Sequence, residues 1–215
     1  FTAQIRAMMR ASIGLENLQI MLPMISNVNE VNSSMQLIKK AHRELTQEGL
    51  EVKFPPVGVM IEVPAAVYQT RALASMVDFV SVGSNDLTQY LLAVDRNNPR
   101  VANLYSAFHP AVLHALYHVV SEAQKVGKQV SICGEMAGDP GAAVLLLAMG
   151  FDVLSMNAAT LLKVKSVIRS VSLDAAQDLL DQVMQMDDAQ MIRSAVDLTL
   201  YNAGVDRLLR SSRTN

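Results

Sequence analysis

The residues of this chain best suited to chemistry stand at the ends of three short apolar runs. Glu62 ends the first run, Asp86 follows the second, and Cys133, the only thiol of the chain, ends the third. The runs cover 57–62, 79–86 and 129–135. Each is β-branched and bounded by turn residues, which indicates a buried parallel strand. Parallel strands end at a common edge, where barrel enzymes build their active sites, so the pattern predicts two carboxylates and a thiol on one rim.

The densest motif is Gly-Ser-Asn-Asp-Leu-Thr-Gln-Tyr at 83–90, with Arg96 six residues beyond it. Gly83 is expected to let the backbone turn sharply off the strand. The amides of residues 84–86, at the start of the next helix, can point at an anion. Asn85 can donate to a phosphate oxygen, and Arg96 can hold a phosphate or carboxylate through two hydrogen bonds. Together these residues predict a phosphate-binding loop.

The carboxylates suggest a magnesium site beside this loop. Mg²⁺ is commonly held by one or two carboxylates together with substrate oxygens, and Asp86 and Glu62 supply two. Glu62 closes an apolar strand, so its carboxylate would be buried without a partner unless a cation meets it. Cys133 could act as a general acid if the pKa of its thiol lies near the working pH.

Structural roles compete with each of these assignments. Asn85 and Asp86 could simply cap the following helix, which is a common role for such a pair. Cys133 could be a small core residue. His114 and His118 lie four apart on a helix, but no third zinc ligand is spaced to complete a site. His109 before a proline is expected to cap or pack.

The hydrophobic pattern alternates strands with helices along the whole chain. Apolar runs predict strands at 18–24, 57–63, 79–83, 129–133 and 153–156. Helical spacing and cap residues predict helices at 1–13, 27–47, 64–75, 86–93, 110–126, 139–149, 158–170, 173–186 and 189–209, with Asn29 capping the second. This alternation suits right-handed crossovers and a parallel sheet with cover on both faces. It fits either an open five-stranded α/β sheet or the last part of a (β/α)₈ barrel whose first strands are missing.

Composition narrows the class of protein. The 215 residues suffice for one domain, they are 51% hydrophobic, and their net charge is −2. Nothing indicates disorder or a basic surface for nucleic acid. No apolar run approaches the ~20 residues of a membrane helix, and no signal segment opens the chain. The lone cysteine suits a reducing cytoplasm.

Three ordered motifs carry a resemblance to a known family. They are Gly-Val-Met-Ile-Glu-Val-Pro at 58–64, Val-Gly-Ser-Asn-Asp-Leu-Thr-Gln-Tyr at 82–90 with Ala-Val-Asp-Arg at 93–96, and Ile-Cys-Gly-Glu-Met-Ala-Gly-Asp at 132–139. The chain resembles the phosphoenolpyruvate (PEP)-utilising enzymes, and among them the Enzyme I group of the bacterial phosphotransferase system. The sequence around these motifs is more similar to the nitrogen-related branch than to the sugar branch. The resemblance covers essentially all of residues 1–215.

The resemblance implies a fold and a set of roles. Residues 1–215 would form the PEP-binding TIM-type (β/α)₈ barrel domain, truncated to about its last five strands and incomplete at its N-terminal end. Glu62 and Asp86 would hold Mg²⁺, Asn85 and Arg96 with Asp86 would bind PEP, and Cys133 would protonate the enolate to give pyruvate. Phosphate would pass to a histidine on a separate N-terminal domain and then to an HPr-like phosphocarrier protein. This part alone would then be inactive in phosphoryl transfer.

Two other functions fit the same residues. The chain could be a non-catalytic dimerisation module of such an enzyme, or a different Mg²⁺-dependent barrel enzyme, such as a lyase or another PEP–pyruvate enzyme, with the same carboxylate pair. Arg96 after Asn-Asp-Leu-Thr-Gln favours the phosphotransferase over the lyase. Because an incomplete barrel leaves two strand edges unpaired, we also expect self-association, with a homodimer as the simplest form. No nucleic-acid or membrane partner is expected.

Overall fold

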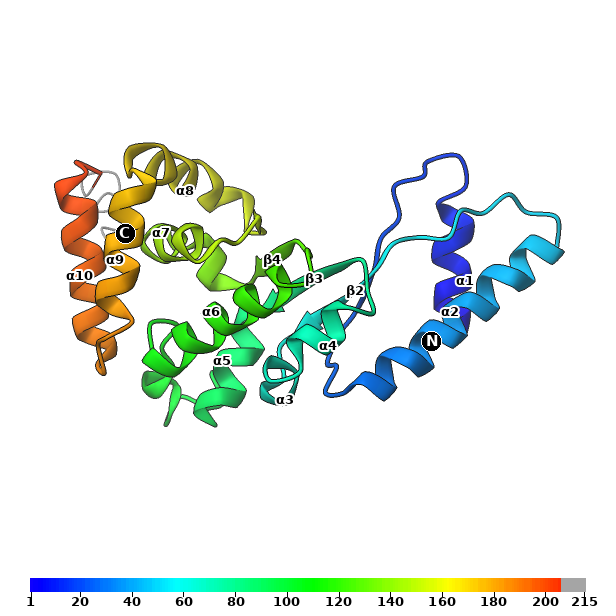
Figure 1. The fold of residues 1–215 in the computed structure, drawn as a ribbon, viewed down its shortest axis with the longest axis horizontal. Coiled ribbons are helices and arrows are strands. Elements are labelled where there is room, and N and C mark those ends of the chain that lie inside the picture. Colours follow the sequence, from blue (N-terminus) through cyan, green and yellow to red (C-terminus); the bar gives the residue numbers. More distant parts are fainter. Residues whose placement is uncertain (206–215) are drawn as a thin grey trace.

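A computed structural model describes residues 1–205, and within them a parallel sheet is flanked by helices (Figure 1). The strands are β1 (Ile20–Leu22), β2 (Val57–Ile61), β3 (Phe79–Gly83), β4 (Val130–Cys133) and β5 (Val153–Leu154). The helices are α1 (Thr2–Ala11), α2 (Val28–Gln47), α3 (Pro64–Val67), α4 (Thr70–Ala74), α5 (Ser84–Leu92), α6 (Pro110–Gln124), α7 (Pro140–Met149), α8 (Ala158–Ser170), α9 (Leu173–Val183) and α10 (Ala189–Asn202). Two 3₁₀ turns, η1 (Ala102–Leu104) and η2 (Glu135–Gly138), follow α5 and β4.

The strands lie in chain order. The sheet runs β1-β2-β3-β4-β5, and every neighbouring pair is parallel. This is the arrangement of successive βα units in a barrel wall, so the predicted α/β class with a parallel sheet is confirmed. The first and last strands are shorter than the runs at 18–24 and 153–156 suggested.

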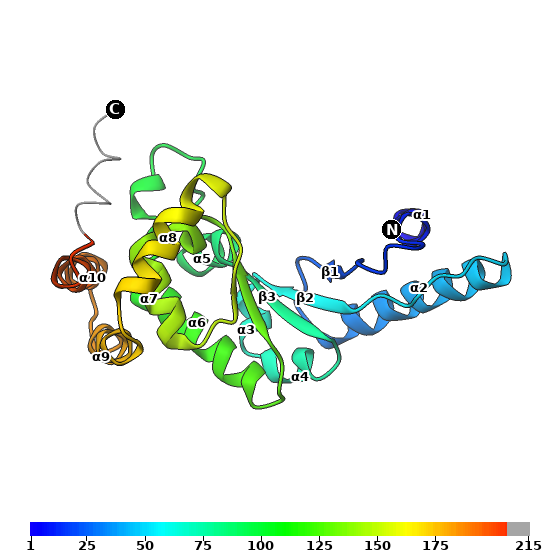
Figure 2. The same cartoon turned by 90° about the horizontal axis from the view of Figure 1, so that it is seen from above.

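The two faces of the sheet differ in cover. The valines and isoleucines of the inner three strands that alternate with Gly58 and Ser81 are fully buried, and Figure 2 shows α4, α6 and α7 on one side of the sheet. On the opposite face Met21 of β1 is 38% exposed and Val153 of β5 is 52% exposed. The cover on this face is thus incomplete at the two outer strands, although Ser81 in its middle is 4% exposed. This fits an incomplete barrel, because it is the face that a closed barrel would enclose.

Several helix boundaries differ from the sequence prediction. Asn27, not Asn29, caps α2, because its side chain accepts from two backbone N–H groups and Glu30 completes a capping box. The helix expected at 64–75 is two short helices, α3 and α4. The helix expected at 189–209 is α10, which ends at Asn202, and positions 206–209 lie outside the described residues.

The molecule is elongated. In Figure 1, α1 and α2 lie at one end and α9 and α10 at the other, with the sheet between them. Arg6 of α1 pairs with Glu44 of α2 at 2.8 Å, so the two helices are joined by charge as well as by buried apolar residues. No helix described between residues 1 and 205 combines the length and the apolarity needed to span a bilayer.

Candidate active site

The three groups singled out from the sequence lie at one edge of the sheet. Glu62 directly follows β2, Asp86 lies in the first turn of α5 directly after β3, and Cys133 is the last residue of β4. The strand register places Cys133 beside Gly83, the last residue of β3. The structure thus assembles both carboxylates and the thiol at the C-terminal ends of neighbouring strands, as predicted.

Glu62 is the buried charge of this edge. The residue is only 4% exposed, and its Oε1 accepts a hydrogen bond of 2.7 Å from the backbone N–H of Met24. Met24 adopts a left-handed conformation with φ of 54°, which is uncommon for a residue with a side chain. Burial raises the pKa of Glu62, and the nearby Asp86 carboxylate raises it further. A cation at this point would relieve both effects.

Gly83 is needed here for space rather than for turning. Its φ is −86°, which any residue can adopt, so the sharp turn expected from the sequence was the wrong reason for this glycine. A Cβ at Gly83 would lie 2.6 Å from Glu62 Oε2 and 3.0 Å from the sulfur of Met60. The absent side chain therefore lets the Glu62 carboxylate lie across the end of β3.

Cys133 is half-buried, and its thiol is held in the protonated form. Burial raises the pKa of Cys133, and the negative charges of Glu62 and Asp86 raise it further. The backbone carbonyl of Cys133 accepts a 2.7 Å hydrogen bond from the hydroxyl of Ser84, which ties the end of β4 to the start of α5. A protonated thiol at a fixed position is suited to donating a proton.

Asn85 links the same two segments through its side chain. Its Oδ1 accepts from the backbone N–H of Glu135 at 3.1 Å, which leaves the amide NH₂ free to donate. Gly83 occupies the N-cap position of α5, and no side chain caps this helix, so the capping role considered for Asn85 and Asp86 is wrong. Gly134, with φ of 102°, turns the backbone where a Cβ would lie 2.4 Å from Ser84 Oγ.

Arg96 returns to the site after α5 ends. Ala93 closes the helix in a left-handed conformation, and the backbone N–H of Arg96 then donates to Gln89 Oε1 at 3.3 Å. Arg96 Nη2 lies 3.9 Å from Asp86 Oδ1. Arg96 Nη1 is buried and finds no hydrogen-bond partner among the described residues. The guanidinium thus has unused donors beside the carboxylates, as an anion site requires.

A cleft of about 510 Å³ opens beside this edge. Its lining comes from the loops after β4 and β5 together with Asn85, namely Cys133, Gly134, Glu135, Gly138, Ser155, Met156, Asn157 and Thr160. A volume of this size accommodates a small organic molecule. Cys133 and Asn85 line the cleft directly, whereas Glu62 and Asp86 are not part of its lining.

The described residues contain no group of three or more histidine, cysteine, aspartate or glutamate side chains arranged to hold a metal. His114 and His118 belong to no such group among the described residues. His109 instead caps α6, accepting from the backbone N–H of Ala111. Two carboxylates, Glu62 and Asp86, remain a donor set suited to Mg²⁺, which takes the rest of its oxygens from substrate and water.

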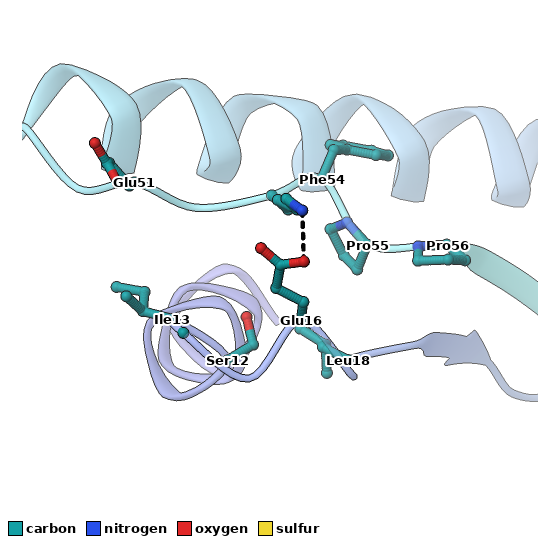
Figure 3. Close-up of a pocket in the computed structure, with 10 residues that line it drawn as sticks. Ser12, Ile13, Glu16, Leu18, Glu51, Phe54, Pro55 and Pro56 are labelled. Carbon is teal, nitrogen blue, oxygen red and sulfur yellow. Dashed lines mark hydrogen bonds and ion pairs between the residues drawn. The ribbon is translucent and has the colours of Figure 1, made fainter.

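A second hollow lies at the opposite end of the strands. It measures about 260 Å³ and is formed by the segments that lead into β1 and β2. Lys53 forms an ion pair with Glu16 there, and Figure 3 draws this pair as a dashed line to the Glu16 carboxylate. None of the residues predicted to act in chemistry lines this hollow.

Sequence reasoning missed several residues of the site. Met24 acts through its backbone N–H, which no side-chain pattern reveals. Ser84 was seen only as part of a loop. Tyr105, in the segment after η1, places its hydroxyl 3.4 Å from the backbone oxygen of Asn85, and no spacing relates it to that residue.

The fold and the site define the chain as a barrel-type α/β domain with two carboxylates, a thiol and an arginine at the C-terminal edge of its sheet. Residues 1–173 match the model of the PEP-binding domain of PEP-utilising enzymes, and the chain belongs to this family. It is 42% identical over 211 residues to the Salmonella typhimurium protein named "Phosphoenolpyruvate-dependent phosphotransferase system", covering 98% of this chain and 28% of that protein. It is 40% identical over 202 residues to the phosphoenolpyruvate-protein phosphotransferase of Priestia megaterium, covering 94% of this chain and 35% of that protein.

The chain therefore spans about a third or less of these relatives. A crystal structure of a citrate lyase from Burkholderia xenovorans LB400 resembles the fold with a TM-score of 0.58 and 16% identity, covering all of this chain and 70% of the other. At that identity the likeness concerns the fold alone, and it is consistent with part of a barrel.

Proposed function

We propose that this chain is the PEP- and Mg²⁺-binding part of a PEP–protein phosphotransferase, of the nitrogen-related branch of Enzyme I. The complete enzyme would move phosphate from PEP to one of its own histidines and then to an HPr-like phosphocarrier protein, releasing pyruvate in the cytoplasm. The observation that carries this proposal is that Glu62 and Asp86 lie close enough to Cys133 for both of their negative charges to raise the pKa of its thiol. The family membership of residues 1–173 supports the choice of PEP as substrate.

The residues would divide the work by their chemistry. Arg96 and Asn85 would donate hydrogen bonds to the anionic groups of PEP, and Asp86 would lie against the bound substrate. Glu62 and Asp86 would hold Mg²⁺, which would supply positive charge where the two carboxylates and the substrate phosphate meet. Cys133, kept protonated by its surroundings, would give its proton to the methylene carbon of the enolate left when the phosphoryl group departs. Water would then restore the thiol proton.

Calorimetric titration of PEP into the 215-residue chain, with and without Mg²⁺, tests the binding part of this proposal. We expect heat of binding that requires both components. Asp86→Asn should abolish the Mg²⁺ requirement or the binding, because it removes one of two metal-binding charges. Asp95→Asn is the matched control, since it removes an equal charge from an exposed loop residue nine positions away.

The alternatives predict other outcomes. A non-catalytic assembly module would self-associate but give no heat with PEP. A Mg²⁺-dependent lyase would bind an oxoacid in preference to PEP. Equal PEP binding by the wild type and Asp86→Asn would contradict the metal assignment. We also propose that the chain forms a homodimer, because β1 and β5 are the unpaired edges of the sheet formed by residues 1–205. A monomer in light scattering at high concentration would contradict this.

A further inference from the structure

A buried polar cluster beneath Arg96 is not used by the roles described above. Thr88, on α5, is fully buried, and its hydroxyl has no hydrogen-bond partner among the described residues. Arg96 Nη1 is likewise buried and unpartnered. Buried polar groups without partners are rare in folded proteins because each costs free energy. Two such groups in one segment, on α5 and in the turn after it, indicate a place where the chain gives up stability for another purpose.

Tyr105 is the third member of this cluster. Its hydroxyl lies 3.4 Å from the backbone oxygen of Asn85, a residue of the anion-binding loop. Burial raises the pKa of Tyr105, while the neighbouring Thr88 hydroxyl and Arg96 guanidinium counteract this rise, so both groups lie against the phenol. The phenol therefore remains protonated, able to donate to Asn85 and to accept from Arg96 with its other lone pair.

The segment that delivers Tyr105 is held firmly by the opposite end of the chain. Phe108, three residues further on, is 8% exposed, and the guanidinium of Arg193 on α10 lies 5.0 Å from the centre of its ring. Arg193 also donates to Asp139 Oδ2 at 2.9 Å, and Asp139 caps α7. The loop between α5 and α6 is thus fastened to two helices near the point where it supplies the hydroxyl.

We propose that Tyr105, together with Thr88, is a positioning residue that holds the Arg96 guanidinium in the orientation that binds the anionic substrate. Asp86 faces one side of this guanidinium through Nη2, at 3.9 Å. Tyr105 lies against both the guanidinium and Thr88, so these two side chains limit how far the guanidinium can turn. Without the two hydroxyls, the guanidinium is free to turn toward Asp86 and to compete with the metal for that carboxylate. This inference rests on the proposed PEP-binding function.

Tyr105→Phe and Thr88→Val remove one hydroxyl each and keep the size of the side chain. We expect each variant to raise the Kd for PEP in the presence of Mg²⁺ by on the order of tenfold, because each removes a hydroxyl that limits the movement of the phenol or of the guanidinium beside it. The melting temperature of Thr88→Val should not fall, because the lost hydroxyl has no partner. Weaker binding without weaker folding separates positioning from a structural role. Tyr117→Phe, which alters a tyrosine that is 47% exposed on α6, is the control and should change neither.

A second measurement needs no substrate. The Arg96 Nε–H resonance, assigned by its loss in Arg96→Lys, should exchange with solvent several-fold faster in Tyr105→Phe than in the wild type. Unchanged exchange in both hydroxyl variants, or unchanged PEP affinity in both, would overturn the positioning role. A wild-type chain that binds no PEP would refute the proposed function instead, and the Arg96 exchange rate alone would then decide the positioning role. If Tyr105→Phe fails to fold, Thr88→Val decides both measurements.

Discussion

Glu62→Gln should make the metal-free protein more stable while removing its response to Mg²⁺. The glutamate is 4% exposed, it accepts one backbone hydrogen bond from Met24, and Asp86 adds a second negative charge nearby. Glutamine has nearly the same shape, and its oxygen can keep the hydrogen bond from Met24. The substitution therefore removes a buried charge without removing its anchor.

The size of the effect follows from the cost of burying an incompletely paired polar group, about 1–3 kcal/mol. In a chain of this length, 1 kcal/mol moves Tm by about 2–4 °C. Glu62→Gln should thus melt at least about 2 °C above the wild type at pH 7 without metal.

The pH dependence has a definite sign. The pKa of Glu62 is raised in the fold above its ordinary value of 4.5, so the folded chain holds this proton more tightly than the unfolded chain. Wild-type stability from this group is complete below pH 4.5 and is lost as pH rises through the raised pKa. The advantage of Glu62→Gln should consequently shrink as the pH is lowered from 7 toward 4.5.

Thermal unfolding followed by circular dichroism, at several pH values and with and without Mg²⁺, measures all three effects. Mg²⁺ should raise the Tm of the wild type and leave that of Glu62→Gln unchanged, because only the wild type binds the ion. Asp95→Asn is the control, because it removes an exposed charge and should not shift Tm. Asp152→Asn would be unsuitable, because Asp152 accepts a hydrogen bond from the backbone N–H of Val130 at the start of β4. A less stable Glu62→Gln at pH 7, or an advantage that does not vary with pH, would refute the reasoning.

Three further predictions concern β4 and the turn after it. Gly134→Ala should lower the free energy of unfolding by well over 1 kcal/mol, because φ of 102° is combined with a Cβ contact of 2.4 Å. Gly49→Ala, with φ of 83° in open space, is the control and should cost about 1 kcal/mol. Equal losses in chemical denaturation would show that the contact at Gly134 relaxes freely. Cys133→Ala in the complete enzyme should bind PEP and Mg²⁺ nearly normally but turn over about 10²–10⁴-fold more slowly, the range for a positioned acid; full turnover would exclude the proton-donor role. Alkylation of Cys133 should be slow at neutral pH and faster in Glu62→Gln than in Asp86→Asn, and PEP should shield the thiol; the same rate in all three proteins would mean that neither carboxylate acts on the thiol.

The parallel sheet was predictable because its signal is local. Short β-branched runs at 57–61, 79–83 and 130–133 carry it, and glycine or proline stops each run. The cap of α2 was placed two residues late, because Asn27 and Asn29 are both good capping residues and only the backbone geometry chooses between them. The break between α3 and α4 has no proline or glycine to announce it, so a continuous helix was the natural expectation.

The placement of Glu62, Asp86 and Cys133 was predictable for a geometric reason. Parallel strands end at the same edge, so residues at three strand ends must share it. The reason for Gly83 was not predictable, because the crowding comes from Glu62 on a neighbouring strand. Tyr105 was missed for the same reason, since its contact with the backbone of Asn85 depends on how the segment after η1 folds back toward α5.

The electrostatic character of the site likewise belongs to the fold rather than to any single residue. Cys133 is an ordinary thiol in the sequence, but burial raises its pKa first, Glu62 second and Asp86 third. The two carboxylates that would hold a cation are thus the same two that keep the thiol protonated. Positive charge placed between them weakens their hold on the thiol proton, while each of the two variants removes only one negative charge. Because Glu62 raises the pKa of the thiol more than Asp86 does, alkylation should be faster in Glu62→Gln than in Asp86→Asn. Because both carboxylates act on the thiol, a variant of either one tests the metal-binding and the proton-donating roles together.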